Sequence, residues 1–263
     1  MTQIDVLVEL QSAKTLVSLR GGKREDGRAL DEYRDISFQT GVSQNANGSA
    51  RVQLGKTDVI AGVKFGIGTP YPDTPNEGAI AVGLELTPLA SPQYEVGPPQ
   101  PKEVELARVV DRCIRESHAI DTASLCLIPG EQVLMMFIDM YALNDDGNMF
   151  DAASMAALLS LNQTRLPKVE DGKIVDYEYA GNLKLANQPL LTTHSKAAGL
   201  ILADPRRTEE HAQSARFSFG STEKGILCAF QKGGSGSFSP SELEQTLDMG
   251  LANAKTLRKR LKV

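Results

Sequence analysis

The stretch that decides the fold runs from Gly97 to Ser117 and reads GPPQPKEVELARVVDRCIRES. Proline restricts the backbone angle φ and disfavours helix in the residue before it, so we expect the helix to start not much before Pro101. Apolar residues then recur at helical spacing and form one face, made of Leu106, Val109, Val110 and Cys113. The pattern predicts an amphipathic helix that packs its apolar face against the rest of the chain.

Arg108, Arg112 and Arg115 are spaced four and three residues apart and therefore form a stripe on this helix. At about 100° per residue, the stripe points nearly opposite the apolar face. One interpretation is a clamp for phosphates or carboxylates, because the guanidinium fork matches both. The other is a solvated face whose charges pair within the helix, Glu105 with Arg108 and Asp111 with Arg115. Spacing alone favours the solvated face, because such pairs are routine on exposed helices.

The composition is that of an ordinary soluble globular protein, with 263 residues, 41% hydrophobic and 23% charged. A formal net charge of −5 gives no sign of a general nucleic-acid binder, so any anion site must be a local cluster. The sequence shows neither a signal-peptide pattern nor an apolar run of membrane-spanning length. We therefore expect a cytoplasmic protein with no membrane partner.

The cysteines Cys113, Cys126 and Cys228 are few, odd in number and set among apolar residues. This predicts buried free thiols in a reducing compartment, not a disulfide framework. No CxxC or HExxH pattern occurs in the sequence. We therefore assign no metal ligand and no cofactor.

The rest of the chain alternates between strand and helix patterns. Apolar runs bounded by turn residues predict strands at 33–40, 50–54, 58–65, 79–86, 132–143, 196–203, 215–219 and 226–231. Helical spacing predicts one or two short amphipathic helices at 4–19. It also predicts helices from 101 onward, at 151–161 and from 239 to the basic end at 255–262. Ser239 and Glu242 form a capping-box pattern at the start of the last helix. We expect 204–210 to be a polar loop, and 168–188 to hold short strands and loops.

This order predicts an α+β fold of two halves, each a sheet with helices on one side. We divide the chain into an N-terminal helical extension (1–22), a first domain (23–190) and a second domain (191–263), with the joint near Pro189. The run SARVQLG at 49–55 is similar to SARFSFG at 214–220, which is a weak hint of internal duplication.

Several motifs together resemble the RNase PH family, over about residues 24–262. They are DGR (26–28) with EYR (32–34), GSARVQLGKT (48–57), PYPDTP (70–75), GPP (97–99) before ELARVVDR (105–112), and DMYALNDDGNMFD (139–151). The runs ELARVVDR and PYPDTP are typical of one branch of that family, the inactive ring subunits of the archaeal exosome. Both halves of the chain are accordingly expected to be RNase PH-like.

The resemblance implies a function that spacing alone does not show. Subunits of this branch pair with an active RNase PH-like subunit, and three such pairs close a hexameric ring. Single-stranded RNA enters the ring from a cap of RNA-binding subunits and is degraded from its 3′ end with inorganic phosphate, which releases nucleoside diphosphates. The active site lies on the partner, and the branch lends it arginines, which correspond here to the RNA-binding candidates Arg108 and Arg112. We assert no such role for Arg115.

The chain departs from the active branch at two places. A phosphate-binding Gly-Arg-Ser run is expected where this sequence reads Asn144-Asp-Asp-Gly. An acidic residue in an Ala-Asp-x-Pro run is expected in the second half, where Arg216 stands instead. Asp204 survives in Leu202-Ala-Asp-Pro, and we interpret it as structural. We therefore assign no catalytic residue and expect the chain alone to be inactive.

Two alternatives stay open at this point. The chain could be a purely structural ring scaffold, without RNA contacts, whose arginines only pair with acids. It could also be an RNase PH-type exoribonuclease that is active on its own, although both runs that this reading needs are missing.

Overall fold

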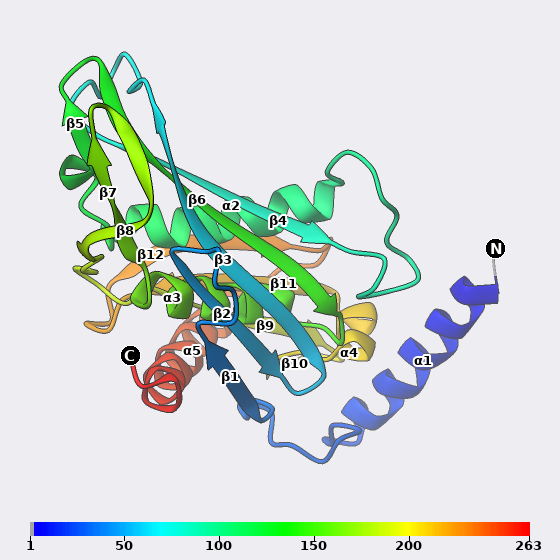
Figure 1. Ribbon diagram of the computed structural model, residues 1–263. Helices are drawn as coiled ribbons and strands as arrows, with labels where there is room; N and C mark the ends of the chain where they lie inside the picture. Colours follow the sequence, from blue (N-terminus) through cyan, green and yellow to red (C-terminus); the bar gives the residue numbers. More distant parts are fainter. Residues whose placement is uncertain (1–2) are drawn as a thin grey trace.

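Helix α3 (Met149–Asn162) lies at the centre of the structure, a computed structural model that describes residues 3–263. Every residue from Met149 to Leu161 is buried, and four of them are alanines that let neighbouring elements approach closely. A helix that is apolar on all sides must be covered on all sides. Accordingly, α3 packs between two β-sheets (Figure 1).

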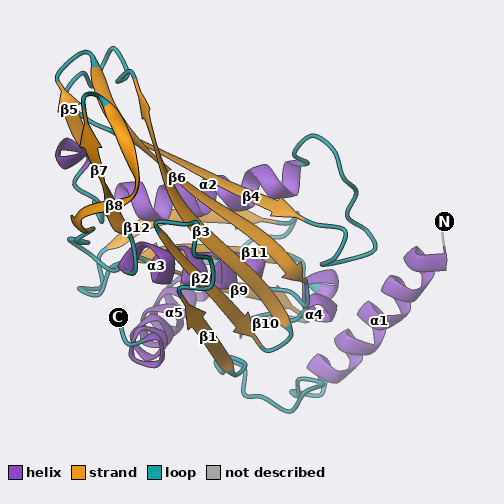
Figure 2. Cartoon of the chain, viewed as in Figure 1, coloured by secondary structure: helices purple, strands orange, loops and turns teal. Residues whose placement is uncertain are grey.

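The first sheet has six strands and lies on one side of α3 (Figure 2). Its strands are β1 (Ile36–Thr40), β2 (Gly48–Leu54), β3 (Thr57–Gly68), β4 (Ala79–Leu86), β5 (Cys126–Ile128) and β6 (Gln132–Asn144). The order is β1-β2-β3-β6-β4, with β5 also paired to β6. Strand β4 runs parallel to β6, so the chain needs a crossover between them, and helix α2 (Pro101–Glu116) supplies it.

The second sheet has four antiparallel strands in the order β10-β9-β11-β12. Its strands are β9 (Leu190–Ala197), β10 (Leu200–Ala203), β11 (Ala215–Ser221) and β12 (Leu227–Gly233). Helix α5 (Pro240–Leu261) packs against β9, β10 and β11. The predicted capping box is confirmed at the start of α5, because the Glu242 amide donates to Ser239 Oγ and the Ser239 amide donates to Glu242 Oε2.

The remaining elements lie around these layers. Strands β7 (Arg165–Glu170) and β8 (Lys173–Asn182) form a separate hairpin. Helix α1 (Gln3–Arg20) stands at the side of the molecule and contacts helix α4 (Arg207–Ala212), and a 3-10 turn, η1, covers Thr122–Leu125 (Figure 1). Among residues 3–263, no helix is long and apolar enough to cross a membrane.

The predicted α+β class is confirmed, but the arrangement of helices differs from the prediction. Helices α2 and α3 both contact strands of both sheets, so the second sheet is covered on both faces, by these two helices and by α5. The reason is the absence of a polar side on α3. The predicted domain boundary near 190 stays a prediction, and residues 1 and 2 of the predicted extension lie outside the described residues.

Two local predictions in the second half were wrong. The expected strand at 196–203 is a hairpin, because Ala198 and Gly199 adopt positive φ angles of 51° and 79° and turn the chain between β9 and β10. The expected polar loop at 204–210 contains most of helix α4 instead. Both elements are too short for a periodic pattern of apolar residues to reveal them.

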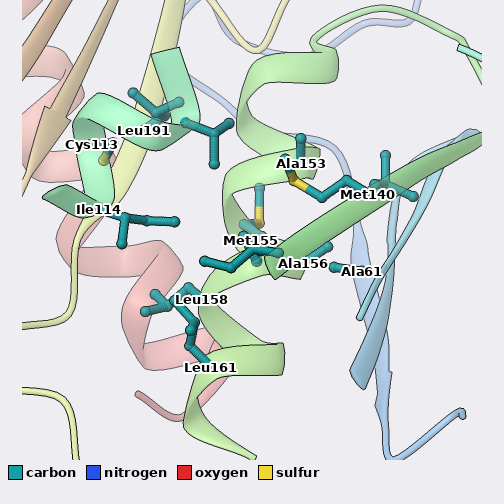
Figure 3. Packing of buried hydrophobic residues seen from close by; sticks show 14 of the residues in the cluster. Ala61, Cys113, Ile114, Met140, Ala153, Met155, Ala156, Leu158, Leu161 and Leu191 are labelled. Carbon is teal, nitrogen blue, oxygen red and sulfur yellow. The ribbon is translucent and has the colours of Figure 1, made fainter. Parts of the chain in front are cut away.

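The core is one cluster that joins both sheets through α2 and α3 (Figure 3). Met140 from β6 meets α3 on one side, and Leu191 from β9 lies on the other. Met155 and Leu158 of α3 are fully buried between them. The predicted free cysteines are confirmed, with Cys113 buried in this cluster and the other two partly buried.

One carboxyl group lies within this apolar layer. Asp151, in the first turn of α3, accepts hydrogen bonds from the Tyr33 hydroxyl (2.7 Å), the Asn148 side-chain amide (2.8 Å) and the Thr193 hydroxyl and amide (2.8 and 3.0 Å). Burial raises the pKa of Asp151 to about 7, although these donors act in the opposite direction. Tyr33 and Thr193 are 160 residues apart in the sequence, and Asp151 ties both to α3.

The stability of the chain is expected to depend on pH through Asp151. Its pKa in the folded protein lies above the ordinary 3.8, so the folded state holds a proton that the unfolded chain has released. The contribution of this group therefore falls as pH rises from about 4 to about 7. The free energy of unfolding of the natural chain minus that of Asp151→Asn should fall by roughly 4 kcal/mol over this range in denaturant titrations. A difference independent of pH would contradict this assignment.

Candidate functional site

Helix α2 begins and packs as the sequence predicts. It starts at Pro101, and the Glu103 carboxylate accepts a hydrogen bond from the Gln100 amide (2.6 Å) just before the first turn. Its buried residues are Leu106, Val109, Val110, Cys113 and Ile114. The apolar face is therefore confirmed, with Ile114 added to it.

The three arginines of α2 have different surroundings. Arg108 is exposed and forms no hydrogen bond or ion pair with any residue that the structure describes. Arg112 is half-buried, and its Nη2 donates to Gln231 Oε1 of β12 (2.8 Å). Arg115 donates to the Asp111 carboxylate (2.8 Å), so the expected pair with Asp111 is confirmed. The stripe is therefore not uniform, because α2 packs against strands of both sheets and its arginines reach different neighbours.

Arg115 also has a structural task at the edge of the first sheet. Strand β4 is an edge strand, and its outer backbone groups need partners. Arg115 Nη2 donates to the Ile80 carbonyl oxygen (3.1 Å), and the Leu86 amide donates to Glu103 Oε1 (2.7 Å). Two side chains of α2 therefore cap β4, which leaves Arg115 committed to the fold.

Glu105 does not pair with Arg108 as expected. It accepts instead from Arg216 Nη2 of β11 (2.5 Å) and from the Gln231 side-chain amide (2.9 Å). The guanidinium carbon of Arg216 also lies 4.3 Å from the centre of the Phe150 ring. Arg216, which stands where a carboxylate was expected, is thus paired within the chain at Nη2, while its buried Nε has no partner among the described residues. Because Gln231 also accepts from Arg112, one network links α2 to the adjacent strands β11 and β12.

The run Asn144-Asp-Asp-Gly holds a buried carboxylate in place of a phosphate cradle. Asp145 is nearly inaccessible, and it accepts from the Tyr94 hydroxyl, Lys102 Nζ (3.3 Å) and the Gly147 amide (3.0 Å). Arg207 Nη1 lies 3.6 Å from the same group. Burial would raise the pKa of Asp145, but the charge of Lys102 and these hydrogen bonds outweigh it and hold the pKa below its ordinary value. The Asp145 carboxylate therefore pairs with the cations at the end of β6, Lys102 and Arg207.

Asp204 has the structural surroundings that we expected from the sequence. It is fully buried and accepts from Arg28 Nη1 (2.9 Å), from Arg34 through its amide, Nε and Nη2 (2.9, 2.9 and 2.7 Å), and from the Asn148 side chain (2.8 Å). Burial acts to raise the pKa of Asp204, and the Arg34 bonds lower it below the ordinary value. The carboxylate thereby fixes the DGR and EYR motifs onto the second sheet.

Sequence reasoning missed the partners that lie far away along the chain. Gln231, Tyr94 and Arg207 carry no motif, yet each one holds a charged residue that the sequence singled out. A buried pair between Arg24 and Glu209 (2.6 Å) was missed for the same reason. The only signal was the density of charge at 24–34, which predicted an ordered turn but not its partners.

Comparison with known proteins gives consistent similarities over nearly the whole chain. The models of the 3′ exoribonuclease family match it at residues 32–167 for domain 1 and at 187–253 for domain 2. The chain is 43% identical over 260 residues to exosome complex component Rrp42 of Methanothermobacter thermautotrophicus, covering 98% of this chain and 96% of that protein. It is 40% identical over 263 residues to the component of the same name from Thermococcus gammatolerans, with the same coverage.

Two solved structures share the fold. A chain of the Archaeoglobus fulgidus exosome with RNA bound to the active site superposes with a TM-score of 0.90 at 37% identity, covering 97% of this chain and 99% of that one. A chain of an archaeal exosome core superposes with a TM-score of 0.89 at 35% identity, covering both chains completely.

The arginines of this site should differ in their effect on stability. Arg216→Ala removes the partner of Glu105 and the cation over Phe150, so it should lower the free energy of unfolding by about 2 kcal/mol. Arg108→Ala is the matched control and should change it by less than about 0.5 kcal/mol, because Arg108 is exposed and unpaired among the described residues. Denaturant unfolding measures both. Equal losses for the two variants would show that the Arg216 network adds nothing.

Proposed function

Because the chain belongs to the RNase PH family of 3′ exoribonucleases, as its motifs predicted, we propose that it is a non-catalytic subunit of an archaeal-type exosome ring. It pairs with an active RNase PH-like subunit, and three such pairs form a hexameric ring beneath a cap of RNA-binding subunits. The similarity to Rrp42 components over the full chain and to chains of exosome cores supports this role. Free thiols are consistent with action in the cytoplasm.

In this proposal the partner performs the chemistry. Inorganic phosphate attacks the phosphorus atom of the last phosphodiester, and the bond from that phosphorus to the 3′ oxygen of the preceding nucleotide breaks. The products are a nucleoside diphosphate and an RNA that is one nucleotide shorter and ends in a 3′ hydroxyl. The chain described here contributes arginines that position the RNA strand close to that active site.

Arg108 and Arg112 are the residues that we assign to this task. The observation that carries the assignment is the exposed Arg108, which is free of ion pairs among the described residues. Arg112 is held at one nitrogen by Gln231, while its buried Nε has no described partner. Arg115 donates hydrogen bonds to Asp111 and to the edge of β4, so we do not assign it to RNA binding. Phosphate contacts from arginine position a strand without reading its sequence.

The surroundings of Asp145 and Arg216 support the non-catalytic part of the proposal. A phosphorolytic site needs cations that are free to bind inorganic phosphate and the RNA phosphate. Here Asp145 accepts a hydrogen bond from Lys102 and lies beside Arg207. Glu105 forms an ion pair with Arg216. Lys102 and Arg207 therefore face a carboxylate of their own chain. Arg216 stands where the active branch carries an acid, and both features argue against an enzyme that acts on its own.

A purely structural scaffold is the second candidate, and the pairs of Arg112 and Arg115 favour it. The difference between the two candidates is whether Arg108 and Arg112 touch RNA. The experiment below separates them.

The double variant Arg108→Ala/Arg112→Ala, reconstituted with an active RNase PH-like partner, should bind single-stranded RNA about tenfold more weakly at 0.1 M salt. The log–log slope of affinity against salt should become shallower by about 1.4, because each phosphate contact to a single strand contributes roughly 0.7. Phosphate-dependent release of nucleoside diphosphates should slow in parallel. Fluorescence anisotropy and product analysis measure these quantities.

The matched control is Lys255→Ala/Lys259→Ala, which removes two exposed charges from α5. It should leave RNA affinity and its salt dependence unchanged. If the α2 double variant behaves like this control in a ring of normal size, the scaffold interpretation is correct and the arginine assignment fails.

A further inference from the structure

A polar pocket of about 420 Å³ lies away from α2, where the start of β2, the end of α3 and the β7–β8 hairpin meet. Its volume falls within the range of about 300–1,000 Å³ that is usual for small-ligand sites. The side chains that line it include Asn47, Ser49, Asn162, Gln163, Arg165 and Asn182. Among the described lining residues none is acidic, so the pocket combines amides and hydroxyls with one positive charge.

The floor of the pocket is built by close backbone packing. A Cβ atom at Gly48 would lie 2.3 Å from the Ser160 carbonyl oxygen, so only glycine lets β2 approach the end of α3 this closely. Asn47 is held in place because its amide donates to the Val63 carbonyl (2.8 Å) and its side chain donates to the Arg165 carbonyl (3.0 Å). These contacts fix the start of β2 and the Asn47 side chain at the floor of the pocket.

Arg165, which lines the pocket, forms a cation–π pair with Tyr179. The guanidinium carbon of Arg165 is 3.8 Å from the centre of the Tyr179 ring, and Arg165 Nη2 donates to the Tyr179 hydroxyl (3.2 Å). These two contacts hold the guanidinium plane over the ring. Unpaired bases of RNA commonly stack on arginine planes and aromatic rings. Tyr179 also lines a neighbouring hollow that shares Asn47, so the surface continues beyond the pocket.

Side-chain amides that could read a base edge surround this surface. Gln163 and Asn182 are exposed, and neither side chain has a hydrogen-bond partner among the residues described. Each amide offers both a donor and an acceptor. The C-terminal end of α3 adds partial negative charge, which disfavours a phosphate group at this position and favours the amino groups of a base.

We propose that this pocket binds one unpaired base of single-stranded RNA, which stacks on Arg165 and forms hydrogen bonds with Gln163 and Asn182. The proposal rests on the proposed function, because that function brings RNA to the ring. The pocket uses no residue of α2, however, so this proposal and the RNA-binding role of Arg108 and Arg112 can fail separately. The pocket would act as a second contact that holds the strand and prefers some bases over others.

The decisive variant is Arg165→Lys in the reconstituted ring, since lysine keeps the charge and loses the plane. Affinity for fluorescein-labelled homopolymers of single-stranded RNA should fall roughly five- to tenfold, with the salt slope unchanged. Asn182→Ala should reduce the differences in affinity among the four homopolymers. Lys173→Ala, an exposed charge on the same hairpin, is the matched control and should do neither. RNA that contains 4-thiouridine should crosslink to the segment 163–182.

The proposal is overturned if Arg165→Lys keeps full RNA affinity in a ring of normal size, or if no crosslink maps to 163–182. It is also overturned if Arg165→Lys prevents ring assembly, because the pocket would then belong to a contact between proteins. If instead the α2 double variant is silent while Arg165→Lys weakens binding, the arginine assignment on α2 fails and the pocket stands.

Discussion

The structure depends on one constraint, which is that helix α3 has no polar side. Met149 to Leu161 are all buried, so both sheets must lie against this helix. Helix α2 lies beside α3 and also packs against strands of both sheets. The buried carboxyl groups of Asp151 and Asp204 then connect this layer to Tyr33, Arg34 and Thr193, which come from distant parts of the chain.

This layer gives each arginine of α2 its role. Because the helix lies between β4 on one sheet and β12 on the other, Arg115 reaches a strand edge and Arg112 reaches Gln231. Only Arg108 is left unpaired among the described residues of the stripe. The same packing places Glu105 beside Arg216 and Lys102 beside Asp145, so both cations are paired within the chain. The proposed role as a helper to another subunit's active site follows from this division of charges.

Much of the fold could be predicted from local pattern, and the contacts of the site could not. Strand β4 and the start of α2 match the prediction, because a short apolar run between turn residues and a proline act over a few residues. The hairpin at Ala198 and the short helix α4 were missed, because they are too short to show a period. The partners of Arg112 and Glu105 depend on how β12 lies beside α2, which no spacing along the chain reveals.

The central claim is that this chain serves an active site that it does not contain. The most direct measurement compares the purified chain alone with the chain mixed with an active RNase PH-like partner, following mass by light scattering and phosphate-dependent release of nucleoside diphosphates from RNA. We expect no release from the chain alone, and a ring of three pairs that degrades RNA from the mixture. Degradation by the chain alone at a rate comparable to that of the mixture would contradict the claim.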